Sequence, residues 1–365
     1  SYENGALRIE NKLDFTDLSS LLYFCWQLKQ DGELLASGQL ELPSVPPHGT
    51  ASLKLPLPSY SGSRVYLTVE MRQKEAKPLT PAGHLLGTEQ FSLSSQAEEI
   101  LLPKGNLPIA VSETERFIAL SGGDFMYCFN KETGCFDQMT FGGQSLLERP
   151  MEYNLYRAPL DNDMYIKKAW QQHGIDRILP PYTYHTTFSQ SEDGVAITCP
   201  LSLQSVLLAN IAEVESVWTV SNSGAVTAEL KVKIRETAPY LPRFGLRFFL
   251  NPEMKHCTYF GYGPQESYID KHLGSVIDRH SAFVSEMHED YIRPQENGSH
   301  FGTETVTLAS PELALTACSE TPFSFSASEY TREELETKAH NWELEKSGYT
   351  ILSLDYKMSG VGSNS

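Results

Sequence analysis

The sequence predicts an all-β protein made of an N-terminal immunoglobulin-like β-sandwich followed by one much larger sandwich. Apolar and polar residues alternate with a period of two along many short segments, as they do in half-buried strands. Glycine, proline or serine bounds each segment, as expected where strands end in turns. Helical periodicity is rare. The chain has 365 residues, 40% hydrophobic and 21% charged, a composition typical of globular domains that can bury a substantial core.

The N-terminal sandwich is expected to occupy residues 1–98. Apolar residues alternate over 22–28, which places Trp26 in the core, and Asp31-Gly32 then provides a tight hairpin turn. Short strands at this spacing, within about one hundred residues, are typical of an immunoglobulin-like sandwich. The other alternating segments of this domain are residues 34–36, 51–57 and 65–71.

The larger domain is expected at residues 112–365. The stretch 96–115 has no sustained period and contains Pro103 and Pro108, so it is interpreted as the domain boundary. Roughly 250 residues of strand pattern with little helix indicate one large sandwich rather than several small domains. Trp218 lies on an apolar strand face and is expected in its core. The alternating segments are residues 125–129, 214–220, 226–234, 323–327 and 352–358.

Two short helices are expected to interrupt these strands. The first begins near Asp163, a plausible N-cap, and ends before Gly174, which suits the position just past a helix. The second begins at Thr331, and Glu334 three residues later completes the pattern of a capping box.

Charge and cysteine pattern restrict the partners of the chain. The sequence has 46 acidic and 29 basic residues, a formal net charge of −17, which disfavours nucleic acid and anionic membranes but is compatible with a neutral sugar. No apolar run is long enough to cross a bilayer. No Cys-x-x-Cys pair or Cys/His cluster has metal-site spacing, so we expect buried thiols in a reducing compartment and no metal site. The cysteines are Cys25, Cys128, Cys135, Cys199, Cys257 and Cys318.

The segment from Arg157 to Asp163 is the most unusual in the chain. It reads Arg-Ala-Pro-Leu-Asp-Asn-Asp and leads from a proline into the first predicted helix. Asp161, Asn162 and Asp163 could bind Ca²⁺, but the alternating ligands, central glycine and distal glutamate of an EF-hand are missing. The favoured interpretation is that Asp163 caps the helix while Asp161 and Asn162 hold a turn.

Two further polar segments stand out. Residues 261–268 contain two glycines, but the third glycine of a dinucleotide loop is absent and a proline follows. A tight turn with Glu266 hydrogen-bonded to backbone is therefore favoured. Residues 291–300 contain Glu296 and His300, which could pair as acid and base, although no third group orients them and surface residues of these types are common.

Taken together and in this order, four segments resemble signatures of the C-terminal region of long β-galactosidases of glycoside hydrolase family 2. Residues 157–163 resemble RAP-x-DND, residues 261–268 G-x-GPQE-x-Y, residues 291–298 Y-x-x-P-x-ENG, and residues 355–362 D-x-x-x-x-G-x-G. The resemblance also reaches the first domain, where residues 11–17 and 89–91 look like its edge strands, so it covers nearly the whole chain.

The resemblance implies that the chain corresponds to the fourth and fifth domains of such an enzyme, the fifth being a galactose-mutarotase-like β-supersandwich. The parent enzyme would hydrolyse terminal non-reducing β-D-galactose residues with retention, using two glutamates on a barrel that this chain lacks. We therefore expect an internal, non-catalytic fragment that scaffolds and walls the sugar pocket. Its expected partners are the N-terminal domains of the parent, a β-galactoside bound through them, and further copies in a homo-oligomer. The expected location is the cytoplasm, and any Mg²⁺ or Na⁺ would be bound by other domains.

The same resemblance assigns one set of residues to the rim of the sugar pocket and another to structural motifs. Loops at 162–166 and 360–365 are expected near the sugar pocket, with an aromatic residue of the pocket beyond them. The rim candidates are Arg157, Asp161, Asn162, Asp163, Gly360 and Gly362, and the structural motif residues are Gly263, Pro264, Gln265, Glu266, Glu296, Asn297 and Gly298.

Two other functions remain open at this point. One is a stand-alone carbohydrate-binding or adhesion module, which binding of galactose or lactose without hydrolysis would favour. The other is an aldose epimerase, which needs a histidine and a glutamate facing a cleft; it ranks last because fold does not fix function. The natural galactoside is not evident from the sequence.

Overall fold

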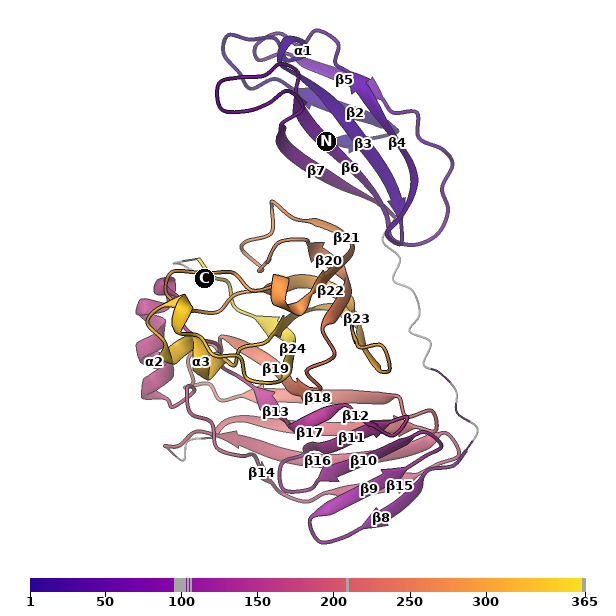
Figure 1. The fold of residues 1–365 in the computed structure, drawn as a ribbon, viewed down its shortest axis with the longest axis vertical. Coiled ribbons are helices and arrows are strands. Elements are labelled where there is room, and N and C mark those ends of the chain that lie inside the picture. The colour runs from indigo at the N-terminus through magenta and orange to yellow at the C-terminus, as the bar shows by residue number, and fades with distance from the viewer. Residues whose placement is uncertain (95–102, 104, 106, 208–209, 363–365) are drawn as a thin grey trace. The chain divides into compact units, whose positions relative to one another are not determined.

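The chain forms two β-sheet units (Figure 1). The computed structural model describes residues 1–94, 103, 105, 107–207 and 210–362. One unit comprises Ser1–Glu99 with Leu273–Arg279, and the other comprises Ile100–His272 with His280–Ser365. The predicted boundary at 96–115 and the predicted loop at 360–365 lie partly outside the described residues. Both units are built from strands with a few short helical segments, so the prediction of an all-β protein is confirmed.

The N-terminal unit packs a three-stranded sheet, in the order β1-β2-β5, with a four-stranded sheet, in the order β4-β3-β6-β7. Asp31 and Gly32 have positive φ angles of 51° and 83° and join β3 to β4, so the predicted two-residue hairpin is confirmed. Trp26 is buried, as expected. The elements are β1 (Tyr2–Glu3), β2 (Ala6–Glu10), α1 (Leu18–Leu21), β3 (Leu22–Gln30), β4 (Glu33–Glu41), β5 (Thr50–Lys54), β6 (Val65–Gln73) and β7 (Leu85–Ser94).

One of the two predicted edge strands in this unit is wrong. Residues 89–91 do lie in β7, at the edge of the four-stranded sheet. Residues 11–17 form a loop instead, because the buried Asn11 side chain donates to the carbonyl groups of Thr16 and Val45, each at 2.8 Å. Asp17 accepts from the backbone N–H of Ser19 at 2.8 Å and caps α1. Side chains that bond to nearby backbone in this way compete with sheet pairing.

The C-terminal unit contains three sheets around one hydrophobic core. The first five-stranded sheet contains β8 (Ala110–Glu113), β9 (Phe117–Ser121), β10 (Phe125–Asn130), β11 (Cys135–Phe141) and β12 (Gln144–Ser145). The second contains β14 (Tyr182–Thr183), β15 (Thr187–Gln190), β16 (Gly194–Gln204), β17 (Asn210–Ser221) and β18 (Val226–Ile234). The seven-stranded sheet has the order β13 (Leu147–Asn154), β19 (Arg243–Leu250), β24 (Thr350–Met358), β23 (Ala314–Ser328), β22 (Ser299–Ala309), β20 (His256–Gly263) and β21 (Val276–Phe283). Residues 276–279 of β21 are those counted with the N-terminal unit.

The core of this unit joins residues from all three sheets. Phe129 of β10, Trp218 of β17 and Phe325 of β23 are all almost fully buried and belong to one contiguous cluster. The rings of Phe129 and Trp218 have centroids 6.2 Å apart. One large sandwich, rather than several small domains, is therefore the observed architecture, and the expected core position of Trp218 is confirmed.

The first predicted helix is displaced from its expected start. A 3-10 helix, η1 (Asp161–Met164), comes first, and α2 (Ile166–Gln172) follows with Tyr165 at its N-cap. Asp163 therefore does not cap α2: its Oδ2 accepts from the backbone N–H of Leu160 at 2.9 Å and closes the 3-10 turn. Gly174 lies just past the helix with φ of 66°, as predicted. The other short 3-10 helices are η2 (Val284–Glu286) and η3 (Asn341–Glu343).

The second predicted helix is present as α3 (Arg332–Thr337). Thr331 accepts from the backbone N–H of Glu334 at 3.1 Å, so this half of the capping box is confirmed. The other half is not formed, because Glu334 Oε1 accepts from the backbone N–H of Glu345 at 2.9 Å. The glutamate thus links α3 to a later segment of the chain.

The alternation predicted for residues 352–358 fails in the last strand. Leu352 is buried, but Tyr356 is 63% exposed while Asp355 is fully buried. The pairing of β19 with β24 shifts register here, since Phe244 lies opposite Lys357 and Gly245 lies opposite Asp355. The extra residue in β24 is a β-bulge, which reverses the side-chain alternation and turns the aspartate inward.

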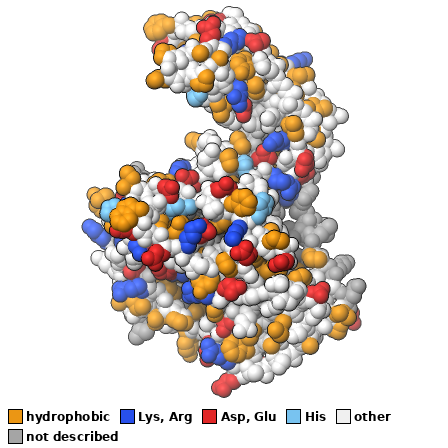
Figure 2. Space-filling view, in the orientation of Figure 1, with side chains coloured by type: hydrophobic (Ala, Val, Ile, Leu, Met, Phe, Trp, Pro, Cys, Tyr) orange, Lys and Arg blue, Asp and Glu red, His pale blue; other side chains and the backbone are white. Residues whose placement is uncertain are grey.

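The six cysteines are all free, but not all buried. Cys135, Cys199 and Cys257 are buried, Cys25 and Cys128 are partly exposed, and Cys318 is exposed. No helix in the described part of the chain is long and apolar enough to span a bilayer. On the face shown in Figure 2, acidic and basic side chains are interspersed.

Candidate functional site

The four sequence motifs come together at one end of the seven-stranded sheet. Strand β13 ends just before Arg157, β19 begins at Arg243, and β24 carries Asp355 near its end. Because β13 pairs antiparallel with β19, and β19 with β24, the end of β13, the start of β19 and the end of β24 meet. The second motif begins in the last residues of β20, and the third ends just before β22. Ser299 at the start of β22 joins this same end through β23. Sheet topology therefore explains why segments far apart in sequence are neighbours.

Arg157 ties the first motif to the last. Its side chain is 1% exposed, and one guanidinium nitrogen donates to Asp163 Oδ1 and to the carbonyl of Gly360, both at 2.9 Å. The second guanidinium nitrogen donates to the carbonyl of Ser359 at 3.0 Å. A buried guanidinium requires such partners, since an unpaired charge in the interior is costly. Arg157 thereby fixes the turn after β24 to the segment before α2.

The exposed residues of the first motif add two further bonds. Asn162 Nδ2 donates to the carbonyl of Val361 at 2.8 Å. The backbone N–H of Asp161 donates to the side-chain oxygen of Gln295, in the third motif, at 3.3 Å. The structure thus brings the rim candidates Arg157, Asp161, Asn162, Asp163 and Gly360 together, and Gly362 joins them through its backbone, as described below.

A buried ion cluster lies beside Arg157 and is centred on Arg243. Its Nε and Nη2 donate to the two carboxylate oxygens of Asp355, at 3.0 and 2.6 Å, and its Nη1 lies 3.4 Å from both oxygens of Glu296. All three side chains are at most 5% exposed. Burial alone lowers the pKa of Arg243, but the charges of Asp355 and Glu296 outweigh burial and raise it. The guanidinium is therefore held in its charged form.

Gly245 makes this close approach feasible. A Cβ placed on Gly245 would lie 2.0 Å from the carbonyl oxygen of Leu354 and 2.6 Å from Asp355 Oδ1. Any side chain there would displace the aspartate from Arg243. Neither Arg243 nor Gly245 belongs to a sequence motif, although the two arginines in the apolar run Arg243–Leu250 were a signal that carboxylates face that strand.

Glu266 organises the two central motifs. Its carboxylate accepts from the backbone N–H of Gly298 at 2.8 Å, from Lys271 Nζ at 2.6 Å and from the Tyr291 hydroxyl at 2.5 Å. The predicted bond of Glu266 to backbone is therefore confirmed. Burial acts to raise the pKa of Glu266, but these three bonds outweigh it and lower the pKa. Gly298 has φ of 68°, a left-handed conformation that suits glycine.

The remaining motif residues lie around this centre. Gly263 ends β20 and is buried, and Pro264 and Gln265 are exposed in the turn that follows. Asn297 accepts from the backbone N–H of Glu289 at 3.1 Å and donates to the carbonyl of Gln295 at 2.9 Å. These contacts shape the loop backbone. Among the described residues, no group of three or more His, Cys, Asp or Glu side chains is arranged to hold a metal ion.

Glu296 and His300, which the sequence left open as an acid–base pair, each have other partners in the structure. Glu296 faces Arg243, whereas His300 Nδ1 lies 3.3 Å from the carbonyl of Tyr262. The imidazole is stacked on Phe325, with ring centroids 5.1 Å apart. Burial lowers the pKa of His300 to about 4, so the imidazole is neutral at neutral pH. A packed, uncharged histidine explains these contacts better than a general acid.

Burial of His300 predicts a specific pH dependence of stability. Its pKa is about 4 in the folded chain and about 6.5 when unfolded, so the unfolded chain binds the proton first as the pH falls. The contribution of the buried, neutral His300 to the free energy of unfolding is complete above about pH 6.5. It is lost as the pH falls from about 6.5 to 4, and the free energy of unfolding should decrease by about 3 kcal/mol over this range. Urea unfolding of the wild type and of His300→Gln across this pH range measures this decrease in the free energy of unfolding. The exposed His185→Gln serves as the control, and an equal pH slope in wild type and His300→Gln would contradict the assignment.

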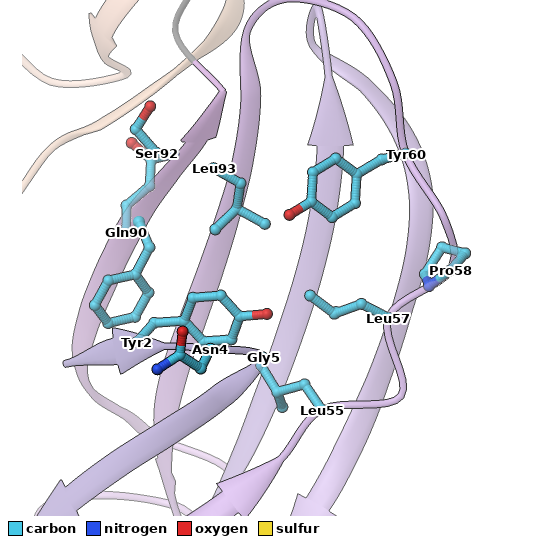
Figure 3. A pocket seen from close by; sticks show the side chains of 11 residues that line it. Tyr2, Asn4, Gly5, Leu55, Leu57, Pro58, Tyr60, Gln90, Ser92 and Leu93 are labelled. Carbon is cyan, nitrogen blue, oxygen red and sulfur yellow. The ribbon is translucent and has the colours of Figure 1, made fainter.

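A separate pocket lies in the N-terminal unit and contains none of the motif residues. It has a volume of about 750 Å³, and Tyr2 and Tyr60 project into it from opposite sides (Figure 3). Leu55, Leu57 and Phe91, which also line it, pack on the core of that sandwich. The pocket is therefore the open edge of the hydrophobic core between two sheets, and the candidate site stays at the sheet end described above.

Comparison with protein families gives two matches that together cover most of the chain. Residues 121–365 match the model of the β-galactosidase small chain, and residues 7–94 match that of β-galactosidase domain 4. Curated relatives include a β-galactosidase of Actinobacillus pleuropneumoniae, 38% identical over 99% of this chain and 36% of the relative. Another is a β-galactosidase of Priestia megaterium, 27% identical over 98% of this chain and 35% of the relative. The chain thus spans about a third of the length of these relatives.

Solved structures give weaker similarities. An aldose 1-epimerase from Escherichia coli K12 aligns with a TM-score of 0.33 at 8% identity, covering 69% of this chain and 100% of its own. A galactose 1-epimerase from Lactobacillus acidophilus aligns with a TM-score of 0.31 at 9% identity, covering 71% of this chain and 93% of its own. Scores this low give the two similarities no weight for function.

Proposed function

Since this chain belongs to the β-galactosidase family, we propose that it is the non-catalytic part of an enzyme that hydrolyses terminal non-reducing β-D-galactose residues with retention. In this proposal the two catalytic glutamates lie on a barrel outside this chain. The chain scaffolds that barrel and walls its sugar pocket with the loops at 157–163 and 359–362. The natural form would be a cytoplasmic homo-oligomer.

The observation that carries the proposal is the rigid junction of those two loops. Arg157 bonds to Asp163 and to the carbonyl groups of Ser359 and Gly360, and Arg243 with Asp355 and Glu296 forms a buried ion cluster beside it. Loops that only bounded a surface would not need buried charges to fix their backbones. Groups that line a substrate pocket do require such support, because small displacements in a pocket are costly for catalysis.

The chain alone is expected to hydrolyse no galactoside. The experiment compares three preparations in a nitrophenyl β-galactoside and lactose assay: this chain, the polypeptide encoded directly upstream of Ser1, and the two together, termed here the assembled enzyme. The proposal requires turnover by the assembled enzyme only. Sustained turnover by this chain alone, or the absence upstream of a barrel with two glutamates, would overturn it.

The same samples test the alternative of a carbohydrate-binding or adhesion module. Isothermal titration of this chain with galactose and lactose should show no saturable binding at millimolar sugar, because the proposal places most of the sugar contacts on the barrel. Millimolar or tighter binding by a chain that contributes nothing to hydrolysis would favour the module.

A further inference from the structure

The turn that follows β24 is held by three side chains from two other segments of the chain. Arg157 binds the carbonyl groups of Ser359 and Gly360, as described above. Asn162 binds the carbonyl of Val361. The backbone N–H groups of the turn have a different partner, Asp270, which lies outside the candidates that the sequence provided.

Asp270 binds two successive backbone N–H groups with one carboxylate. The N–H of Val361 lies 2.9 and 3.0 Å from its two oxygens, and the N–H of Gly362 lies 2.7 Å from Oδ2. Consecutive N–H groups that converge on one anion form a backbone nest, and bonds to a charged acceptor are stronger than neutral ones. Both the direction and the position of the backbone at 361–362 are thereby fixed.

Asp270 is itself oriented by the Glu266 cluster. It lies at the tip of a turn in which Tyr268 and Lys271 exchange two backbone bonds, at 2.9 and 3.0 Å. Tyr268 is 3% exposed, and Lys271 Nζ bonds to Glu266. The turn that carries Asp270 is therefore held at one end by the buried Tyr268 and at the other by the ion pair of Lys271 with Glu266. Residues of the second motif thus determine the position of Asp270.

We propose that Asp270 is a positioning residue that sets the course of residues 360–362 along the sugar pocket. The inference rests on the proposed function, in which this turn forms part of the pocket wall. Asp270 would touch no substrate and would act through the backbone of Val361 and Gly362. Its exposure argues against a main role in stability, because hydrogen bonds and ion pairs of exposed groups add little to the free energy of unfolding.

The first test measures the turn in the 365-residue chain itself. Hydrogen exchange followed by mass spectrometry should show the amides of Val361 and Gly362 exchanging about tenfold faster in Asp270→Ala, while the unfolding midpoint of the chain stays unchanged. Asp270→Asn keeps one carbonyl oxygen, so its exchange rates at these amides should lie between those of the wild type and of Asp270→Ala. Unchanged exchange at these amides in Asp270→Ala would overturn the anchoring role.

The second test measures the assembled enzyme. Asp270→Ala should raise KM for a nitrophenyl β-galactoside about tenfold, with kcat changed less than about twofold, and Asp270→Asn should recover part of the loss. The matched control is Asp17→Ala, which also removes a carboxylate that accepts from two backbone N–H groups, those of Ser19 and Val45, but in the N-terminal unit. It should leave both constants unchanged.

The failures of the two proposals are distinguishable. Faster exchange at 361–362 combined with an unchanged KM in Asp270→Ala would overturn the positioning role while leaving the proposed function intact. An inactive wild-type assembled enzyme would overturn the proposed function, and the exchange experiment would still decide whether Asp270 anchors the turn.

Discussion

Replacing Arg243 by methionine should lower the free energy of unfolding of the C-terminal unit by about 3 to 5 kcal/mol. The substitution removes the positive charge between Asp355 and Glu296, whose side chains are both at most 5% exposed. It leaves the fully buried Asp355 without its cationic partner, and the buried Glu296 keeps only the weaker electrostatic effect of Arg157. Methionine fills much of the arginine volume, so the loss reports on charge more than on packing.

Urea unfolding followed by tryptophan fluorescence measures this effect, because Trp170 and Trp218 are both buried in the C-terminal unit. The matched control is Arg235→Met at an exposed position, with an expected change below about 0.5 kcal/mol. The triple variant Arg243→Met with Asp355→Leu and Glu296→Leu should recover much of the loss, since an apolar replacement of a whole ion cluster is often tolerated. A loss below about 1 kcal/mol in Arg243→Met would show that the cluster is not buried as described.

Replacing Arg157 by methionine should lower the free energy of unfolding by about 3 kcal/mol and loosen the turn after β24. Asp163, whose side chain is 6% exposed, would lose its ionic partner, and the carbonyl groups of Ser359 and Gly360 would lose their donors. Trp170 would also lose the guanidinium that lies 5.9 Å from its ring centroid. The amides at 359–362 should therefore exchange faster, which hydrogen exchange with mass spectrometry measures.

The lysine variant at this position separates charge from geometry. Arg157→Lys keeps the positive charge but lacks the planar fork that reaches Asp163 and two carbonyl groups at once. We expect it to recover less than half of the stability lost in Arg157→Met. Full recovery by lysine would show that a point charge suffices, and that the three separate bonds do not determine the structure of this turn.

The sequence was informative about strands because each follows a local rule. Alternation over 22–28 and the Asp31-Gly32 pair together specify a hairpin without reference to the rest of the chain. Local rules failed where a side chain bonded to a backbone group that the pattern does not indicate. Asn11 holds a loop in place of a predicted strand, and Asp163 closes a 3-10 turn in place of capping α2.

The candidate site was predicted only in part, for the same reason. The motifs identified Arg157 and Glu266, but Arg243 and Asp270 acquire their roles from partners that are distant in the sequence. The bulge that turns Asp355 inward is a property of the pairing between β19 and β24, and a single strand pattern does not contain it. Charged residues within apolar runs were the one local sign of these long-range contacts.

The bonds of Arg157 and Arg243 also determine when the site can form. Arg243 and Asp355 are separated by 112 residues, and Arg157 and Gly360 by 203 residues. During synthesis, the two arginines leave the ribosome long before Asp355 and Gly360 do, and closing such long loops is entropically costly. Earlier sheets can assemble meanwhile, but the site is completed only after β24 has emerged. A ribosome that stalls before residue 350 would release a chain in which Arg243 lacks Asp355 and Arg157 lacks the carbonyl groups of Ser359 and Gly360, while Glu296 and Asp163 are already present.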